Sequence, residues 1–301
     1  MKRVFISAFL VVMAVLMCSG LVYPAMAAGS APVAENLELR TYRNVSVSGQ
    51  LSAFDPENDV VKFEICTQPV KGHIELAPDG SFVYTPNQDK KGKDYFGYKA
   101  TDSEGNVSQE ATVIIRIEKQ KKDVSYSDMK GSAGEYAALL MSEEGIFTGE
   151  QIGGEYCFYP ERSVSRGEFI SMCLLVSDEP IISGVLSTGY SDDEDIPQWM
   201  KPYVATTVMC GMDSISDETD CFQPNAPITK SEAVLMLNEA LGLNDVSYIE
   251  LDETLAPEMA QACANLSASG ILKDGEAVEE TLSRIDAAEL LSKALELMSR
   301  R

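Results

Sequence analysis

The sequence predicts a multidomain protein, with an N-terminal all-β sandwich followed by an all-α module. The first observation is that apolar and polar residues alternate in short runs between about residues 31 and 118, as in strands with one buried face. The second is a motif, a hydroxyl residue followed three positions later by a carboxylate, that opens three amphipathic segments after residue 125. The third is a polar stretch at 119–124, which we expect to be a linker.

The first 27 residues have the layout of a secretory signal peptide. A charged start precedes the apolar run 5–17, and Ala25-Met26-Ala27 matches the small-x-small pattern of a cleavage site. The apolar run is short for a transmembrane anchor. Cys18 suggests the alternative of a lipidated protein, but Met17 is larger than the residue usual before a lipidated cysteine. We expect cleavage after Ala27 and an exported chain that inserts into no membrane.

The charge and the rarity of histidine limit the function. Removing Lys2 and Arg3 with the signal leaves 22 basic and 47 acidic residues, a net charge of −25. That excess argues against nucleic acid and anionic lipid as partners. His73 is the single histidine, the cysteines show no C-x-x-C spacing, and no carboxylate pair stands out. We therefore expect no enzyme and no cofactor, with an exported carbohydrate-active enzyme as the alternative.

The N-terminal module contains short strand-like runs at regular spacing. Pro78-Asp79-Gly80 is typical of a hairpin turn between two of them. Short strands at this spacing predict a sandwich. The runs that carry the alternation are 45–48, 60–65, 72–76, 81–84, 94–100 and 111–117.

Residues 28–118 also resemble a bacterial cadherin-like or immunoglobulin-like surface domain. The resemblance implies a spacer or adhesive module, carries no reaction with it, and leaves the partner of the module unknown. The segments that carry it are Ala31-Pro32-Val33-Ala34, the runs 49–57 and 68–74, Asp79-Gly80-Ser81-Phe82-Val83-Tyr84-Thr85-Pro86, Asp94-Tyr95-Phe96-Gly97-Tyr98 and Thr101-Asp102-Ser103-Glu104-Gly105.

Oxygen-bearing side chains gather in two loops of this module. They are the kind of donor that calcium prefers, which keeps a calcium-dependent adhesin as an alternative function. Residues of this kind are also common in turns that bind no metal. The sequence leaves both interpretations open for Asp55, Glu57, Asn58, Asp59 and Asp102.

Three capping boxes organise the C-terminal module. They are Ser165–Phe169, Thr229–Ala233 and Ser283–Ala287, and an apolar stripe at helical spacing follows each. The residue after each cap is basic, although a cation at a helix N-terminus opposes the helix dipole. Either each cation forms an anion site with the helix N-terminus, or each pairs with a carboxylate of a neighbouring copy. The three cations are Arg166, Lys230 and Arg284.

The C-terminal module resembles three S-layer homology repeats, at 125–180, 190–243 and 247–298. Two copies share an aromatic-Ser-Asp start, a helix that ends near glycine, and an aromatic-x-Pro loop before the box. The third copy is divergent and has lost that loop. The shared segments are Tyr126-Ser127-Asp128 with Phe158-Tyr159-Pro160, and Tyr190-Ser191-Asp192 with Phe222-Gln223-Pro224.

This resemblance implies a three-pronged helical module that binds secondary cell-wall polysaccharide, often pyruvylated, in grooves between the prongs. The implied polymer-binding residues are Arg166, Arg284 and, more weakly, Lys230, together with Asp128, Asp192 and Trp199. We expect Arg166 to contribute most, because its box and its copy are intact. The expected protein is a non-catalytic one, secreted and held on the cell wall of a bacterium with a thick peptidoglycan layer, where it displays the β module.

Overall fold

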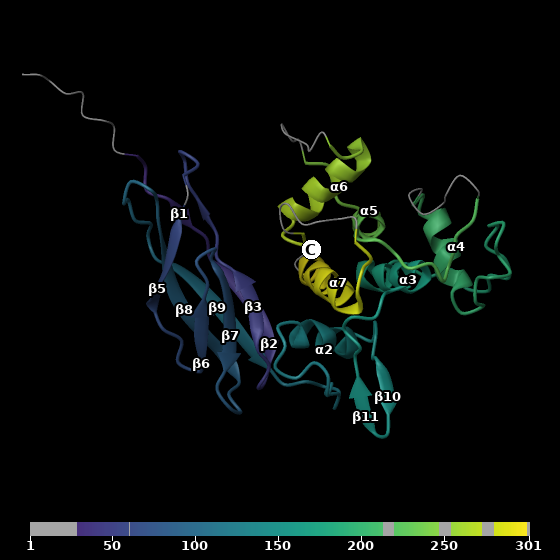
Figure 1. Ribbon diagram of the computed structural model, residues 1–301, viewed down its shortest axis with the longest axis horizontal. Coiled ribbons are helices and arrows are strands. Elements are labelled where there is room, and N and C mark those ends of the chain that lie inside the picture. Colours follow the sequence, from purple (N-terminus) through teal and green to yellow (C-terminus); the bar gives the residue numbers. More distant parts are fainter. Residues whose placement is uncertain (1–28, 60, 213–219, 247–253, 273–279, 300–301) are drawn as a thin grey trace, which may run out of the picture.

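The computed structural model describes residues 29–59, 61–212, 220–246, 254–272 and 280–299. A β-sandwich comes first and a helical region with six helices among the described residues follows it (Figure 1), as the sequence predicts. The predicted signal peptide, its cleavage site and the expected opening of the third copy at 248–250 lie outside the described residues. No helix in the described ranges has both the length and the apolar character needed to cross a membrane.

The sandwich consists of two main sheets. In the larger sheet β2 runs parallel to β9, whereas the other neighbours are antiparallel. The order there is β2 (Leu37–Tyr42), β9 (Ala111–Glu118), β8 (Gly92–Thr101) and β5 (Lys62–Thr67). The smaller sheet contains β3 (Val47–Gln50), β7 (Ser81–Pro86) and β6 (Gly72–Leu76), and β1 (Val33–Ala34) pairs with β4 (Ala53–Phe54).

The core of the sandwich follows from alternation along the strands. Every second residue of β9 faces inward, so that Val113, Ile115 and Ile117 are buried. Phe82 of β7 meets Phe96 of β8 across the two sheets, with ring centroids 5.3 Å apart. Burying side chains of this size stabilises a fold by about 1.5–3 kcal/mol each. The hairpin predicted at Pro78–Gly80 joins β6 to β7 and is confirmed.

The six helices pair across the copies in a cyclic order. The last helix packs against the first, α3 against α4, and α5 against α6, while α3 also contacts α5 and α7. Each pair thus combines the box helix of one copy with the first helix of the next. The helices are α2 (Glu135–Glu143), α3 (Arg166–Ser177), α4 (Lys201–Met209), α5 (Lys230–Leu241), α6 (Pro257–Ala268) and α7 (Arg284–Met298).

All three capping boxes are confirmed, and the residues that precede them are hydrogen-bonded to one another. In each box the hydroxyl accepts the backbone N–H of the third residue, whose carboxylate accepts the N–H of the cap. The buried residue before each cap belongs to a closed ring of backbone hydrogen bonds. Val164 donates to Leu282, Leu282 to Ile228, and Ile228 to Val164, at 2.9–3.1 Å. This ring gives the helical region an approximate threefold axis.

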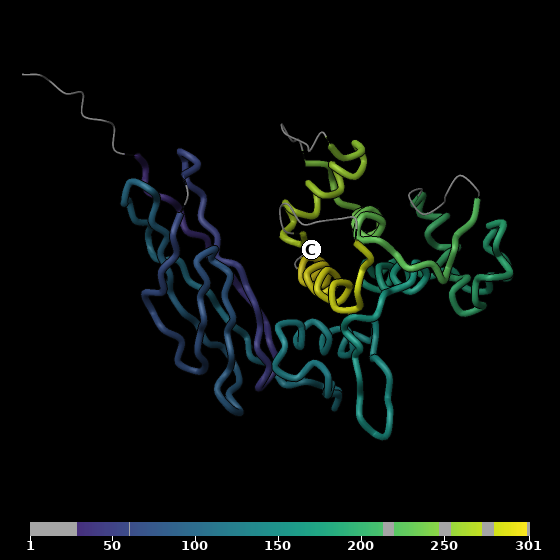
Figure 2. The backbone as a smooth tube through the Cα atoms, viewed as in Figure 1, coloured from purple at the N-terminus to yellow at the C-terminus, as the bar shows by residue number. Residues whose placement is uncertain are grey.

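Two features were not predicted. A hairpin of β10 (Glu150–Ile152) and β11 (Glu155–Cys157) projects from the first copy (Figure 2), and it is too short and too exposed to show an alternating pattern. The linker is also attached to the helical region. The backbone N–H groups of Lys121 and Lys122 donate to the Glu143 carboxylate at 2.9 and 2.7 Å. The sandwich itself also contacts α2, since the ring centroids of Tyr42 of β2 and Tyr136 lie 5.4 Å apart.

Candidate functional site

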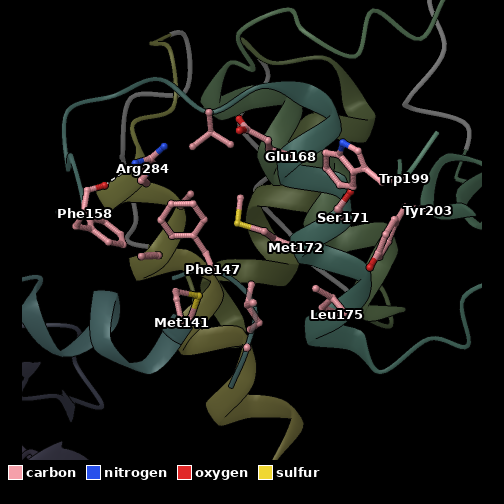
Figure 3. Close-up of a pocket in the computed structure, with 15 residues that line it drawn as sticks. Met141, Phe147, Phe158, Glu168, Ser171, Met172, Leu175, Trp199, Tyr203 and Arg284 are labelled. Atoms are coloured by element: carbon pink, nitrogen blue, oxygen red, sulfur yellow. Dashed lines mark hydrogen bonds between the residues drawn. The ribbon is translucent and has the colours of Figure 1, made fainter. Parts of the chain in front are cut away.

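A pocket of about 360 Å³ lies between the α7–α2 pair and the α3–α4 pair. Its walls come from all three copies, because α4 belongs to the second copy and α7 to the third. Figure 3 shows Arg284 and Phe158 on one side and Trp199 and Tyr203 on the other, with Met172 between them. The lining residues used below are Phe147, Phe158, Glu168, Met172, Trp199, Tyr203 and Arg284.

Trp199 and Tyr203 form an aromatic wall. Their ring centroids lie 6.4 Å apart, and Trp199 is 57% exposed, which is unusual for a tryptophan. When the copies are aligned on the glycines that follow their first helices, smaller or charged residues occupy these two positions elsewhere. They are Ala133 and Ala137 in the first copy, and Glu258 and Ala262 in the third. The aromatic wall is therefore particular to the second copy.

Arg284 lies at the opposite wall with a charge that no carboxylate of the described residues neutralises by an ion pair. The residue is 7% exposed, its Nη1 donates to the carbonyl of Phe158 at 2.6 Å, and its guanidinium lies 4.5 Å from the ring centroid of Phe147. Burial, followed by repulsion from Arg162, lowers the pKa of Arg284. The charges of Glu168, Glu150 and Asp128 act in the opposite direction and raise it.

The other two box cations are paired. Arg166 is 8% exposed, forms an ion pair with Glu232, and donates from Nε to the carbonyl of Phe222 at 3.1 Å. Lys230 lies 3.5 Å from Glu280 and 3.8 Å from Asp286. Of the two interpretations of the sequence, pairing with a neighbouring copy therefore describes Arg166 and Lys230. Both reach the box carboxylate of the next copy.

By this symmetry the partner of Arg284 is Glu168, but no ion pair joins them in the described part of the chain. Glu168 lines the same pocket, and its Oε2 is used by its own cap, accepting the N–H and hydroxyl of Ser165 at 2.9 and 3.0 Å. The carboxylate still attracts Arg284 through space. The first two copies thus form an ion pair between the box cation and the next box carboxylate, whereas Arg284 and Glu168 do not form the third.

Asp128 and Asp192 hold loops. Asp128 accepts the backbone N–H groups of Phe158 and Tyr159 at 2.9 and 2.7 Å. Asp192 does the same for Phe222 and Gln223, at 2.8 and 2.7 Å. Asp128 thereby positions the Phe158 carbonyl that accepts from Arg284, and Asp192 positions the Phe222 carbonyl that accepts from Arg166. Both were expected to bind the polymer, whereas in the structure their oxygens accept hydrogen bonds from the backbone.

The sequence did not predict the contacts that hold the start of α4 in place. Lys201 is 9% exposed and its Nζ lies 2.6 Å from Asp193, which holds the pKa of Asp193 well below its usual range. Gly167 lets α4 approach, because a Cβ there would lie 2.1 Å from the sulfur of Met200.

The calcium candidates behave as turn residues. Asp55 Oδ1 accepts the N–H groups of Glu57 and Asp59, and Asp102 Oδ1 accepts those of Glu104 and Asn106. One observation differs, since Asp55 Oδ2 is buried and has no hydrogen-bond partner. However, among the residues with described positions, no three His, Cys, Asp or Glu side chains lie close enough to hold a metal ion. The donor set does not by itself fit calcium.

The comparisons with known proteins found one family model and several solved structures. No curated protein matches the chain. The sialic-acid-binding region of a Streptococcus sanguinis adhesin is 14% identical, with 33% of this chain and 31% of that chain covered at a TM-score of 0.25. An endo-fucoidan hydrolase of glycoside hydrolase family 107 is 17% identical over 31% of this chain and 15% of its own length, also at 0.25.

The chain thus spans less than a third of either structure, and scores this low transfer no function. Titin domain M3 is 15% identical, with 29% of this chain and 97% of the domain covered, at a TM-score of 0.19. The family model for the bacterial cadherin-like domain matches residues 29–119. These bounds agree with the β-sandwich and stop before the helical region, so residues 29–119 carry a bacterial cadherin-like domain.

Proposed function

We propose that this is a non-catalytic bacterial surface protein whose helical region anchors it by binding an acidic wall polysaccharide in the Arg284 pocket. The observation that carries the proposal is the buried guanidinium of Arg284, which forms no ion pair with a described residue and faces an aromatic wall across a pocket large enough for a sugar. S-layer homology repeats, which residues 125–298 resemble, supply the class of ligand: secondary wall polymer, often pyruvylated.

The recognition would combine one charged contact with one apolar contact. A carboxylate or phosphate accepts hydrogen bonds from Arg284, each worth about 1.5–3 kcal/mol when charge-assisted. The apolar face of the sugar ring packs on Trp199 and Tyr203. The net charge of the protein repels an anionic polymer over distance, so the attraction has to be local. Binding should therefore depend on contacts inside one Debye length, about 8 Å at physiological salt.

This proposal moves the main contact from Arg166, which the sequence favoured, to Arg284. Arg166 and Lys230 have carboxylate partners in neighbouring copies, and a ligand would have to displace them. Arg284 needs no such displacement in the described structure. The divergence of the third copy therefore does not weaken its groove, because the pocket walls are built mainly by the first two copies.

The pocket suits binding better than glycoside hydrolysis. A glycosidase of the usual kind needs two carboxyl groups that flank the scissile bond. Of the described residues that line this pocket, Glu168 alone carries a carboxylate, and it is engaged by its cap. We therefore assign no catalytic step to it.

The cadherin-like domain would be the displayed part, as a spacer or an adhesive surface. A calcium-dependent form of adhesion keeps one supporting observation, the unpartnered Oδ2 of Asp55. Thermal melting of the mature chain with and without millimolar calcium separates the two. A rise in melting temperature that disappears in Asp55→Asn favours calcium, and an unchanged melting curve favours the spacer.

Co-sedimentation with purified wall sacculi tests the anchoring. Mature protein should sediment with intact sacculi and remain soluble once the secondary polymer has been stripped from them. Arg284→Ala should remain in solution with both, whereas Arg116→Ala, which removes the same charge from the β-sandwich, should behave as wild type. Equal sedimentation of Arg284→Ala and wild type would refute the proposal.

A further inference from the structure

A second depression lies beside the Arg284 pocket. It has a volume of about 560 Å³ and is formed by the aromatic-x-Pro loop of the first copy together with β10. Nothing in the proposed anchoring contact uses it. Its lining residues are Asp128, Glu150, Tyr159, Pro160, Glu161 and Arg162.

The two hollows share one loop. Phe158 lines the Arg284 pocket and its neighbour Tyr159 lines the depression. The start of α7 is fastened to the same loop, because the backbone N–H of Arg284 donates to Arg162 at 2.8 Å and that of Ile285 to Pro160 at 3.1 Å. Consecutive residues of one loop therefore line the two hollows.

Tyr159 presents an aromatic ring at the edge of the depression. Its φ is +57°, a left-handed conformation that non-glycine residues rarely adopt, and the hydrogen bond from its N–H to Asp128 holds it there. The equivalent Gln223 has a φ of +55°, so the backbone shape belongs to both loops. What distinguishes the first copy is the ring, which is 37% exposed.

The charges around this ring disfavour the binding of an acidic sugar in the depression. Arg162 pairs with Glu150 at 2.5 Å, and both side chains are about half exposed. Asp128 and Glu161 add two more carboxylates, so the lining is net negative. Carboxylates accept hydrogen bonds from hydroxyl or amino groups and repel anions, while Arg162 can donate to a hydroxyl or carbonyl oxygen. An aromatic ring in such surroundings suits a neutral or amino sugar.

We propose that the depression at Tyr159 is a second sugar subsite, which binds a non-acidic residue of the polymer next to the acidic residue held by Arg284. This inference rests on the proposed function and adds a chemical order to it: an acid-bearing sugar in the pocket, and a neutral or amino sugar on Tyr159. The protein would then recognise a pair of unlike sugars, and polymers with acid groups on every residue would bind poorly.

Calorimetry on the mature chain with two probes tests the subsite. The first probe is a methyl glycoside that carries a single pyruvyl ketal, and the second is wall polymer released from sacculi and fractionated to short oligosaccharides. Tyr159→Ala should weaken oligosaccharide binding about five- to tenfold, as expected for an aromatic contact at an interface. It should leave the affinity for the glycoside unchanged.

Two further variants guard the interpretation. Gln223→Ala, at the equivalent position of the second copy, should change neither affinity. Glu150→Ala removes a proposed acceptor while the ring stays in place, and it should weaken binding of the oligosaccharide alone, which keeps the test valid if Tyr159→Ala fails to fold. Equal losses for both probes, or none for the oligosaccharide, would overturn the subsite. If Arg284→Ala leaves both affinities intact, the anchoring proposal falls and the subsite falls with it.

Discussion

Arg166 and Arg284 occupy the same position in two copies of one motif, yet their surroundings differ. Arg166 forms an ion pair with Glu232 and donates a hydrogen bond to the carbonyl of Phe222. Arg284 reaches the equivalent carbonyl of Phe158 but forms no ion pair within the described structure, and a pocket opens beside it. The comparison teaches that a repeated cation can be structural in one groove and available for ligand in the next.

The largest effect in this comparison should be on stability. Arg166→Ala leaves Glu232 without its partner and the Phe222 carbonyl without its donor, so unfolding should become easier by about 2–4 kcal/mol. Chemical denaturation of the mature chain measures it. A double-mutant cycle with Glu232→Gln isolates the pair, and additive losses would show that the pair contributes little.

The next effect should be on binding. Arg284→Gln removes the charge and should weaken polymer binding about ten- to a hundredfold, the range of a lost charge-assisted contact. Unfolding should change less than for Arg166→Ala, because no carboxylate of the described chain loses an ion-pair partner. Calorimetry and melting on the same sample decide this. A larger loss of stability than in Arg166→Ala would contradict the comparison.

A smaller effect on binding should come from the aromatic wall. Trp199→Ala should weaken binding about tenfold and leave the melting temperature almost unchanged, since the side chain is mostly exposed. Met209, the last residue of α4 and 76% exposed, lies outside the pocket and gives the control variant Met209→Ala. Similar losses in both variants would mean that the wall is not a specific contact.

The smallest effect should be on how stability depends on pH, through the ion pair between Lys201 and Asp193 at the start of α4. The pKa of Asp193 is held low by Lys201, so the pair stabilises the fold fully above the unfolded pKa of about 4 and less as the pH falls toward the folded value. Asp193→Asn should lower stability at pH 7 and flatten its decrease between pH 4 and 2. Denaturation at a series of pH values checks this, and a parallel curve for the variant would rule it out.

Local features were the most predictable part of the molecule. The three capping boxes and the hairpin at Gly80 depend on neighbours within a few residues, and both are present as predicted. The cadherin-like domain was also recognisable, because its strand pattern extends over the whole domain.

Which of the box cations form ion pairs with another copy could not be predicted in the same way. Whether Arg166 meets Glu232, and whether Arg284 meets Glu168, depends on how helices more than 60 residues apart in the sequence are placed by the hydrogen-bonded ring at Val164. The close approach of Met200 to Gly167 could not be predicted from the sequence either. Contacts of this kind arise only when the copies pack together.

The most direct test of the account is to observe the arginine side chains during binding. In the mature protein labelled with ¹⁵N, the Nε–H resonance of Arg284 is assigned by its disappearance in Arg284→Lys, and that of Arg166 by Arg166→Lys. On addition of the pyruvylated methyl glycoside, the account predicts a saturable shift of the Arg284 resonance and almost none for Arg166. A saturable shift of Arg166 with Arg284 unmoved would contradict it.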